Sequence, residues 1–253
     1  MSGEIDARDP WAALRAATPA RIGLERCGDG LPTQSLLDFQ LAHARARDAV
    51  HGAVDFAALA ARIEPLLPVL RVKSAVPDRA AYLRRPDLGR RLAPDSRALL
   101  QGDGVRQRVD AVFVIADGLS AAAVETQAAP LLECCLALLP HDWALAPAVL
   151  AEQARVGLGD EICALLNADL CAVLIGERPG LSAADSLGVY LTWRPSPGHK
   201  DSDRNCLSNI HGRGLSIDQA AAKLVWLMTE ARRRQVTGIA LKENAGAAAL
   251  PKT

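Results

Sequence analysis

Residues 170–182 read Leu-Cys-Ala-Val-Leu-Ile-Gly-Glu-Arg-Pro-Gly-Leu-Ser, an apolar run that breaks into a charged loop. The first six residues show no polar alternation, which is typical of a strand covered on both faces, as in a parallel sheet between helices. The glycines and the proline that follow argue against a helix. In open α/β sheets, ligands bind beside the carboxyl ends of the strands, so we expect Glu177 and Arg178 to lie near a ligand.

Strands and helices alternate on both sides of this run. The apolar patterns predict strands at residues 109–116, 144–150 and 187–193 and helices at 119–139, 160–166 and 216–234. The last helix opens with Ser216-Ile-Asp-Gln219, a capping box, and Gly238 marks its expected end. This order predicts an α/β fold with a doubly wound, mainly parallel sheet over residues 105–253.

The first 104 residues have a different pattern, and we predict a helical N-terminal region there. Helices are expected at residues 10–17, 35–50 and 56–67, the second opening with a capping box, Ser35-Leu-Leu-Asp38. Leu37, Leu41 and Ala44 recur on one face of that helix, and its charged face is either solvated or docks on a partner. Residues 69–72 form a short apolar stretch, and residues 77–104 are expected to be irregular.

Composition and charge exclude several classes of protein. The 253 residues carry 29 basic and 29 acidic side chains, and aromatic residues make up 4%. Zero formal net charge gives no general attraction to nucleic acid or to an anionic membrane, so we expect neither partner. No apolar run approaches the roughly 18 residues of a membrane span, which favours a cytoplasmic protein. The six cysteines include no Cys-x-x-Cys pair, so buried reduced thiols are expected.

Familiar catalytic and binding motifs are missing from the sequence. It contains no Gly-x-Gly-x-x-Gly, no Gly-x4-Gly-Lys-Ser/Thr and no Gly-x-Ser-x-Gly, and no two histidines have metal-ligand spacing on one helix. Ser120 is expected in the first turn of a helix. Polar loops follow three predicted strands, at residues 116–120, 151–160 and 176–180, and together they predict a ligand crevice. Residues 204–210, Arg-Asn-Cys-Leu-Ser-Asn-Ile, are interpreted as a turn with Cys206 buried, or else as a further part of that crevice.

The sequence resembles, at these loops and over nearly its whole length, the family of ethanolamine ammonia-lyase small (light) subunits. The resemblance is carried by motifs such as Val114-Ile-Ala-Asp-Gly-Leu-Ser120, Ala154-Arg-Val-Gly-Leu-Gly-Asp-Glu161 and Ile175-Gly-Glu-Arg-Pro-Gly180. Further matching segments lie at residues 20–24, 31–33, 39–43, 46–51 and 204–210. Their common order makes coincidence improbable.

The resemblance implies a helical N-terminal region (residues 1–104) that docks on a large subunit, and a Rossmann-like domain (105–253) that contacts adenosylcobalamin at their interface. It implies that Val156, Glu177 and Cys206 contact the cobalamin. The sequence lacks Asp-x-His-x-x-Gly, so base-on cobalamin is expected. The hetero-oligomer would convert ethanolamine to acetaldehyde and ammonia by a radical mechanism. The substrate pocket would lie in the large subunit, so we assign no catalytic residue and no protein-bound metal here.

Two other functions stay open at this point. One is a stand-alone α/β enzyme that binds a nucleotide in the same crevice, although the phosphate-binding motifs are missing. The other is an assembly factor without cofactor contact, in which the basic N-terminal helix docks on a partner. Some family members work inside bacterial microcompartments, and this sequence carries no clear address for one.

Overall fold

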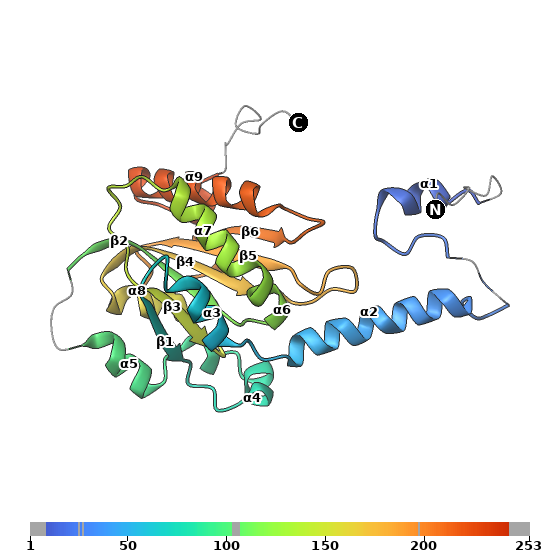
Figure 1. The fold of residues 1–253 in the computed structure, drawn as a ribbon, viewed down its shortest axis with the longest axis horizontal. Coiled ribbons are helices and arrows are strands. Elements are labelled where there is room, and N and C mark those ends of the chain that lie inside the picture. Colours follow the sequence, from blue (N-terminus) through green and yellow to red (C-terminus); the bar gives the residue numbers. More distant parts are fainter. Residues whose placement is uncertain (1–8, 25, 27, 103–106, 197, 243–253) are drawn as a thin grey trace.

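The structure is a computed structural model, and it describes residues 9–24, 26, 28–102, 107–196 and 198–242 (Figure 1). The alanine-rich tail from Asn244, which the sequence pattern predicts to be frayed, lies outside these residues. The strands are β1 (Val69–Lys73), β2 (Val109–Ala116), β3 (Ala148–Glu152), β4 (Ala168–Gly176), β5 (Leu187–Trp193) and β6 (Asn205–Ile210). The α-helices are α1 (Ala12–Ala17), α2 (Thr33–His51), α3 (Phe56–Ile63), α4 (Arg79–Arg84), α5 (Pro94–Gln101), α6 (Ala121–Ala123), α7 (Ala129–Leu138), α8 (Leu158–Leu165) and α9 (Ile217–Arg234). Short 3-10 turns lie at Leu88–Arg90, Asp201–Asp203 and Gly238–Ala240, and a π turn at Val124–Ala128 joins α6 to α7.

The strands of the described chain form one six-stranded sheet in the order β1-β3-β2-β4-β5-β6. Neighbouring strands from β1 to β4 are parallel, whereas β5 and β6 are antiparallel to their neighbours. The sheet is therefore mixed, and the prediction of a mainly parallel sheet holds only for its first four strands. Ten residues without a helix join β4 to β5, fewer than a parallel crossover usually needs, so the chain turns back as a hairpin.

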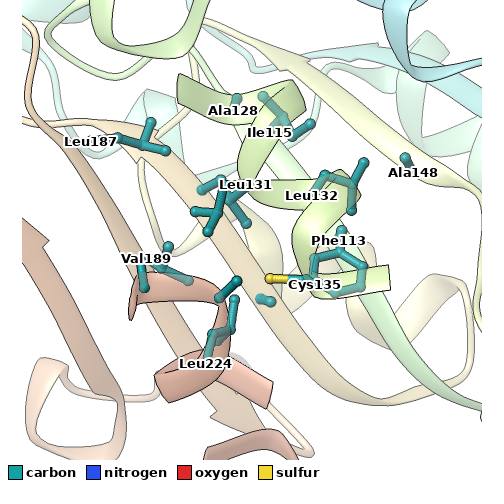
Figure 2. Packing of buried hydrophobic residues seen from close by; sticks show 14 of the residues in the cluster. Phe113, Ile115, Ala128, Leu131, Leu132, Cys135, Ala148, Leu187, Val189 and Leu224 are labelled. Carbon is teal, nitrogen blue, oxygen red and sulfur yellow. The ribbon is translucent and has the colours of Figure 1, made fainter. Parts of the chain in front are cut away.

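Helices cover both faces of the sheet, which explains why β2 and β4 are apolar at nearly every position. Phe113 and Ile115 of β2 pack in the cluster that contains α3, α7 and α9, while Val112 and Val114 pack in the cluster that contains α5 and α8. Figure 2 shows the first cluster, with side chains of α7 lying against Phe113 and Ile115. Residues 121–138 are long and apolar enough to span a membrane by composition, but half of them are buried, as in a core helix.

The capping predictions had mixed outcomes. Ser216 and Gln219 form the predicted capping box of α9, with reciprocal contacts of 3.3 and 3.4 Å. The helix ends at Arg234, and its C-cap is Gln235, which adopts the left-handed conformation (φ 57°), and not Gly238. Gly238 has φ 74° in the next turn, where a Cβ atom would lie 2.2 Å from the carbonyl oxygen of Ser202. Gly238 is thus required for a close approach of two chain segments.

The N-terminal segment is helical, but it also contributes to the sheet. β1 pairs with β3, and α4, a 3-10 turn and α5 form in residues 77–104. The helix α2 begins at Thr33 after Pro32, so Ser35 does not cap it. Among the described residues of α2, only Ala49 is buried, and the helix extends away from the sheet (Figure 1). Leu37 and Leu41 on its apolar stripe are about half exposed, so the described residues leave much of this stripe uncovered.

The cluster at 204–210 forms the edge strand β6, so its interpretation as a turn is wrong. Leu207 and Ile210 of this strand are buried in the core, whereas Cys206 is exposed and not buried. Most residues of this strand are polar, so its sequence did not indicate a strand, and a bulge interrupts its register with β5. The amide of Asn205 does bond the backbone, because it accepts from Gly238 N (2.8 Å) and donates to Leu241 O (2.7 Å).

Candidate functional site

A cavity of about 380 Å³ lies at the carboxyl ends of three parallel strands. Its walls come from the loops after β2, β3 and β4, together with Tyr82 of α4 and Tyr190 of β5. The chain leaves β2 toward α6 on one face of the sheet and leaves β3 toward α8 on the other face. Loops that diverge in this way open a crevice between adjacent strands. The predicted crevice is therefore present at the predicted edge.

The buried carboxylate of Asp117, at the end of β2, organises two of these loops. It accepts hydrogen bonds from the backbone N–H groups of Gly118 (2.9 Å), Gln153 (2.9 Å) and Ala154 (3.0 Å). Gln153 adopts φ 53°, an unusual conformation for a residue with a side chain. Burial raises the pKa of Asp117 to about 6, although these three donors and the nearby Arg79 act in the opposite direction. Asp117 thus fixes the start of the segment that carries Val156.

Arg79 joins α2 to the same loops. Its guanidinium donates to Val50 O from Nε (2.8 Å) and Nη2 (2.6 Å) and to Gly118 O from Nη1 (2.9 Å). One face of the buried Tyr82 ring lies 4.7 Å from the Arg79 guanidinium, and the guanidinium of Arg155 lies 4.2 Å from the same ring. The Tyr82 hydroxyl donates to Ala154 O at 2.9 Å. These cation–π contacts stabilise the cavity wall, which Tyr82 and Arg155 themselves help to form.

Glu177 lies directly after β4, half buried in the cavity wall. Its Oε2 atom accepts a hydrogen bond from Ser186 Oγ (2.5 Å) and from Asn209 N (3.2 Å). Oε1 accepts no hydrogen bond from the described residues. Gly188 leaves room for this carboxylate, because a Cβ atom there would lie 2.9 Å from Oε1. Glu177 can therefore accept hydrogen bonds from a ligand that carries N–H groups.

Val156 lines the same cavity, and Cys206 lies beside it. Cys206 pairs with Tyr190 across the β5–β6 ladder, and Tyr190 lines the cavity. Although Cys206 is exposed by surface area, desolvation by the atoms packed around its sulfur raises the pKa of the thiol, against a hydrogen bond with Tyr190 that lowers it. Burial together with Cys206 raises the pKa of Tyr190 to about 12. Both groups are therefore neutral hydrogen donors near pH 7. Cys135, Cys163 and Cys171 are buried free thiols, as expected, whereas the free thiol Cys134 is only partly buried, and none of the four lines the cavity.

A larger cavity of about 880 Å³ adjoins the first one. The two cavities share Arg155, Val156 and Tyr190 in their linings. The larger cavity extends over the start of α8 and is rich in charge, including the buried ion pair between Arg204 and Asp160 at 2.6 Å. Among the described residues, no group of three His, Cys, Asp or Glu side chains could hold a metal ion.

The sequence located the loops correctly but missed most of the residues that shape them. Asp117 and Arg155 lie inside predicted loops, and Asp117 could have been singled out as a charged residue directly after an apolar strand. Arg79 and Tyr82 carried no signal, because they belong to a segment predicted to be irregular. Ser120 caps α6, as expected near a helix start, by accepting from Ala123 N at 3.2 Å.

The fold and the site define an α/β protein with a ligand cavity at the strand ends and a helical arm outside the sheet. Residues 8–242 match the sequence model of a family described as ethanolamine ammonia-lyase light chain (EutC). The chain is 52% identical to an ethanolamine ammonia-lyase small subunit of Xanthomonas campestris pv. campestris (strain B100), over 94% of this chain and 89% of the relative. It is 54% identical to one of Rhodopseudomonas palustris (strain BisA53), over 91% and 89%. The chain belongs to the family of ethanolamine ammonia-lyase small (light) subunits, and it is a component of a lyase complex.

Proposed function

We propose that this chain forms one wall of an adenosylcobalamin site at the interface with the large subunit of ethanolamine ammonia-lyase. In this proposal the complex converts ethanolamine to acetaldehyde and ammonia, and the cobalamin is bound base-on. The observation that carries the proposal is a cavity at three strand ends, lined by Glu177 with a free carboxylate oxygen, in a member of this family.

The residues of the cavity fit such a ligand. The corrin ring carries amide side chains, and an acceptor such as Glu177 Oε1 suits their N–H groups. Val156 offers an apolar contact, and the exposed thiol of Cys206 offers a small, neutral one. A cavity of about 380 Å³ in this chain suits one edge of a large ligand whose remainder a second subunit covers.

This chain's own residues bind and orient the cofactor. When bound, the cofactor supplies radical chemistry through homolysis of its cobalt–carbon bond. Glu177 would bind the amide side chains of the corrin. The contact between Arg155 and the Tyr82 ring stabilises the cavity wall beside Glu177 and so keeps its carboxylate in position. We place the substrate pocket in the large subunit and assign no catalytic residue to this chain.

The same proposal includes a division of the chain into two domains and a cellular location. We assign residues 105–253 to a Rossmann-like, doubly wound domain that contacts cobalamin, and residues 1–104 to docking on the large subunit. We propose a cytoplasmic complex, with encapsulation in a bacterial microcompartment as a further option for this family.

The direct test is co-expression of the chain with the large subunit. We expect a stable complex with a cobalamin spectrum and ethanolamine-dependent release of acetaldehyde, whereas each chain alone should give neither product nor tight cobalamin binding. Turnover of a substrate by the purified chain alone would contradict the proposal.

Replacing Glu177 should weaken cofactor binding. We expect Glu177→Ala to reduce the cobalamin affinity of the assembled complex about tenfold, since one charge-assisted hydrogen bond is worth roughly 1.5 kcal/mol or more. Glu177→Gln, which keeps an acceptor oxygen, should lose less. Spectrophotometric titration of the complex measures both, with the exposed Glu64→Ala as the matched control. Unchanged affinity in Glu177→Ala would remove the assigned role.

The exposed face of α2 should be needed for assembly. Leu37 and Leu41 are about half exposed and lie four residues apart, so they share one face of the helix. We expect the double change Leu37→Asp, Leu41→Asp to abolish co-purification with the large subunit, because charges would replace apolar contacts. The control is Arg47→Asp, on the polar face of the same helix, and circular dichroism checks the fold. Normal co-purification of the leucine variant would place the docking surface elsewhere.

A further inference from the structure

The larger cavity carries positive charge that its own acids do not neutralise. Asp160 pairs with Arg204, Glu161 pairs with Arg97, and Asp87 pairs with Arg85 outside the cavity. The remaining acid is the exposed Asp201, at the rim. Three arginines of the cavity form no ion pair with an acid among the described residues. These are Arg90, Arg91 and Arg155.

Two of the cavity's guanidinium groups also have unfilled donors. The Nε atoms of Arg155 and Arg204 are buried, and neither donates a hydrogen bond within the described chain. The Arg204 side chain is only 3% exposed. Arg155 engages a single acceptor, Tyr82 O, at 3.2 Å from Nη2. Buried donors without acceptors are costly, so these groups favour a ligand that brings acceptor oxygens.

The start of α8 lies in the same cavity. Gly157 precedes the helix and provides no side-chain cap. The N–H groups of Leu158 and Gly159 donate to Arg155 O (2.9 Å) and Val156 O (3.0 Å), so the helix adds to the arginines through the positive end of its dipole. The stem of Arg90 lies over this point, since a Cβ atom on Gly157 would be 3.4 Å from Arg90 Cγ. A phosphate group matches this combination of guanidinium groups and a helix start.

The shared lining shows how one ligand can occupy both cavities. Arg155, Val156 and Tyr190 form the ridge between them. Cobalamin has neutral amides around the corrin and one phosphodiester, in the nucleotide loop that carries its lower base. Resting on the proposed function, we infer that the larger cavity binds this phosphodiester, with Arg90 and Arg155 as its cationic contacts. Glu177 and the arginines then read two chemically different parts of the same cofactor.

The test compares two corrinoids on the co-expressed complex. Cyanocobalamin carries the nucleotide loop, and dicyanocobinamide has the same corrin without it. We expect Arg90→Gln to weaken cyanocobalamin binding about tenfold in spectrophotometric titrations and to leave cobinamide binding unchanged. Arg155→Gln, which also removes a wall residue of the Glu177 cavity, should weaken the binding of both corrinoids, and that of cyanocobalamin about tenfold more. Arg90 is exposed, so the Arg90→Gln variant should fold normally. Arg155→Lys keeps the positive charge, so it separates the loss of charge from the loss of the guanidinium contact with the Tyr82 ring. The control is Arg84→Gln, on α4 outside both cavities.

The outcomes separate this inference from the proposed function. Equal loss of affinity for both corrinoids, or no loss for either, would overturn the inference while the proposed function stands. No corrinoid binding by the unaltered complex would overturn the proposed function itself. Binding of inorganic phosphate that depends on Arg90, without any difference between cobalamin and cobinamide, would assign the cavity to a free phosphate and also overturn the inference.

Discussion

Arg204→Ala should lower the free energy of unfolding by about 3–5 kcal/mol, the cost of leaving one member of a buried ion pair alone. Arg204 is almost fully buried and donates to both carboxylate oxygens of Asp160, at 2.6 and 2.7 Å, and to Thr192 Oγ1 at 2.8 Å. The pair ties the first residues of β6 to α8 across the end of β5. Its loss leaves the Asp160 carboxylate, which is 8% exposed, without its cationic partner.

Urea unfolding of the full chain, followed by circular dichroism, measures this change. The matched control is Arg85→Ala, which breaks an exposed pair with Asp87 and should leave the midpoint almost unchanged. The double variant Arg204→Met, Asp160→Leu should recover much of the loss, because apolar groups of similar size can replace a buried pair. An Arg204→Ala midpoint as high as that of Arg85→Ala would mean that solvent screens the pair.

Local pattern predicted those parts of the fold where burial dominates the choice of residue. The runs in β2 and β4 are apolar because helices cover both faces, and the stripe and cap of α9 are intact in the structure. The strand β6 escaped prediction because it is an edge strand. Only Leu207 and Ile210 face the core, so its other positions carry polar residues that look like a turn.

The sequence predicted where the candidate site lies, but it did not predict the contacts that hold its loops in position. Position after an apolar strand is a local property, and it pointed to Glu177 and to the loop of Val156. The contacts that brace these loops join residues far apart in sequence, such as Arg79 with Gly118 and Tyr82 with Ala154. Such pairings depend on how α4 packs beneath the sheet edge, which no periodicity in a single sequence encodes.

Asp117 should make the stability of the chain depend on pH in the direction opposite to most paired carboxylates. Burial raises its pKa in the folded chain to about 6, from an ordinary value of 3.8. Between these two values the folded chain keeps the proton and the unfolded chain releases it. Asp117 therefore contributes about 3 kcal/mol to the free energy of unfolding at pH values well below 3.8. This contribution is lost as the pH rises through 6.

Comparison with Asp117→Asn isolates this contribution. Asn does not titrate, and its amide N–H would oppose one of the backbone donors, so we expect the variant to be less stable than the native chain at every pH. That deficit should be about 2.4 kcal/mol larger at pH 4 than at pH 7, because part of the unfolded chain also keeps the proton at pH 4; urea unfolding at both pH values measures it. Asp87 and Glu230, whose pKa values lie near 2 because of hydrogen bonds from arginines, act alike in both proteins and cancel. A constant deficit would mean that the three backbone donors and Arg79 offset the burial of the carboxylate, and that Asp117 stays ionised throughout this range.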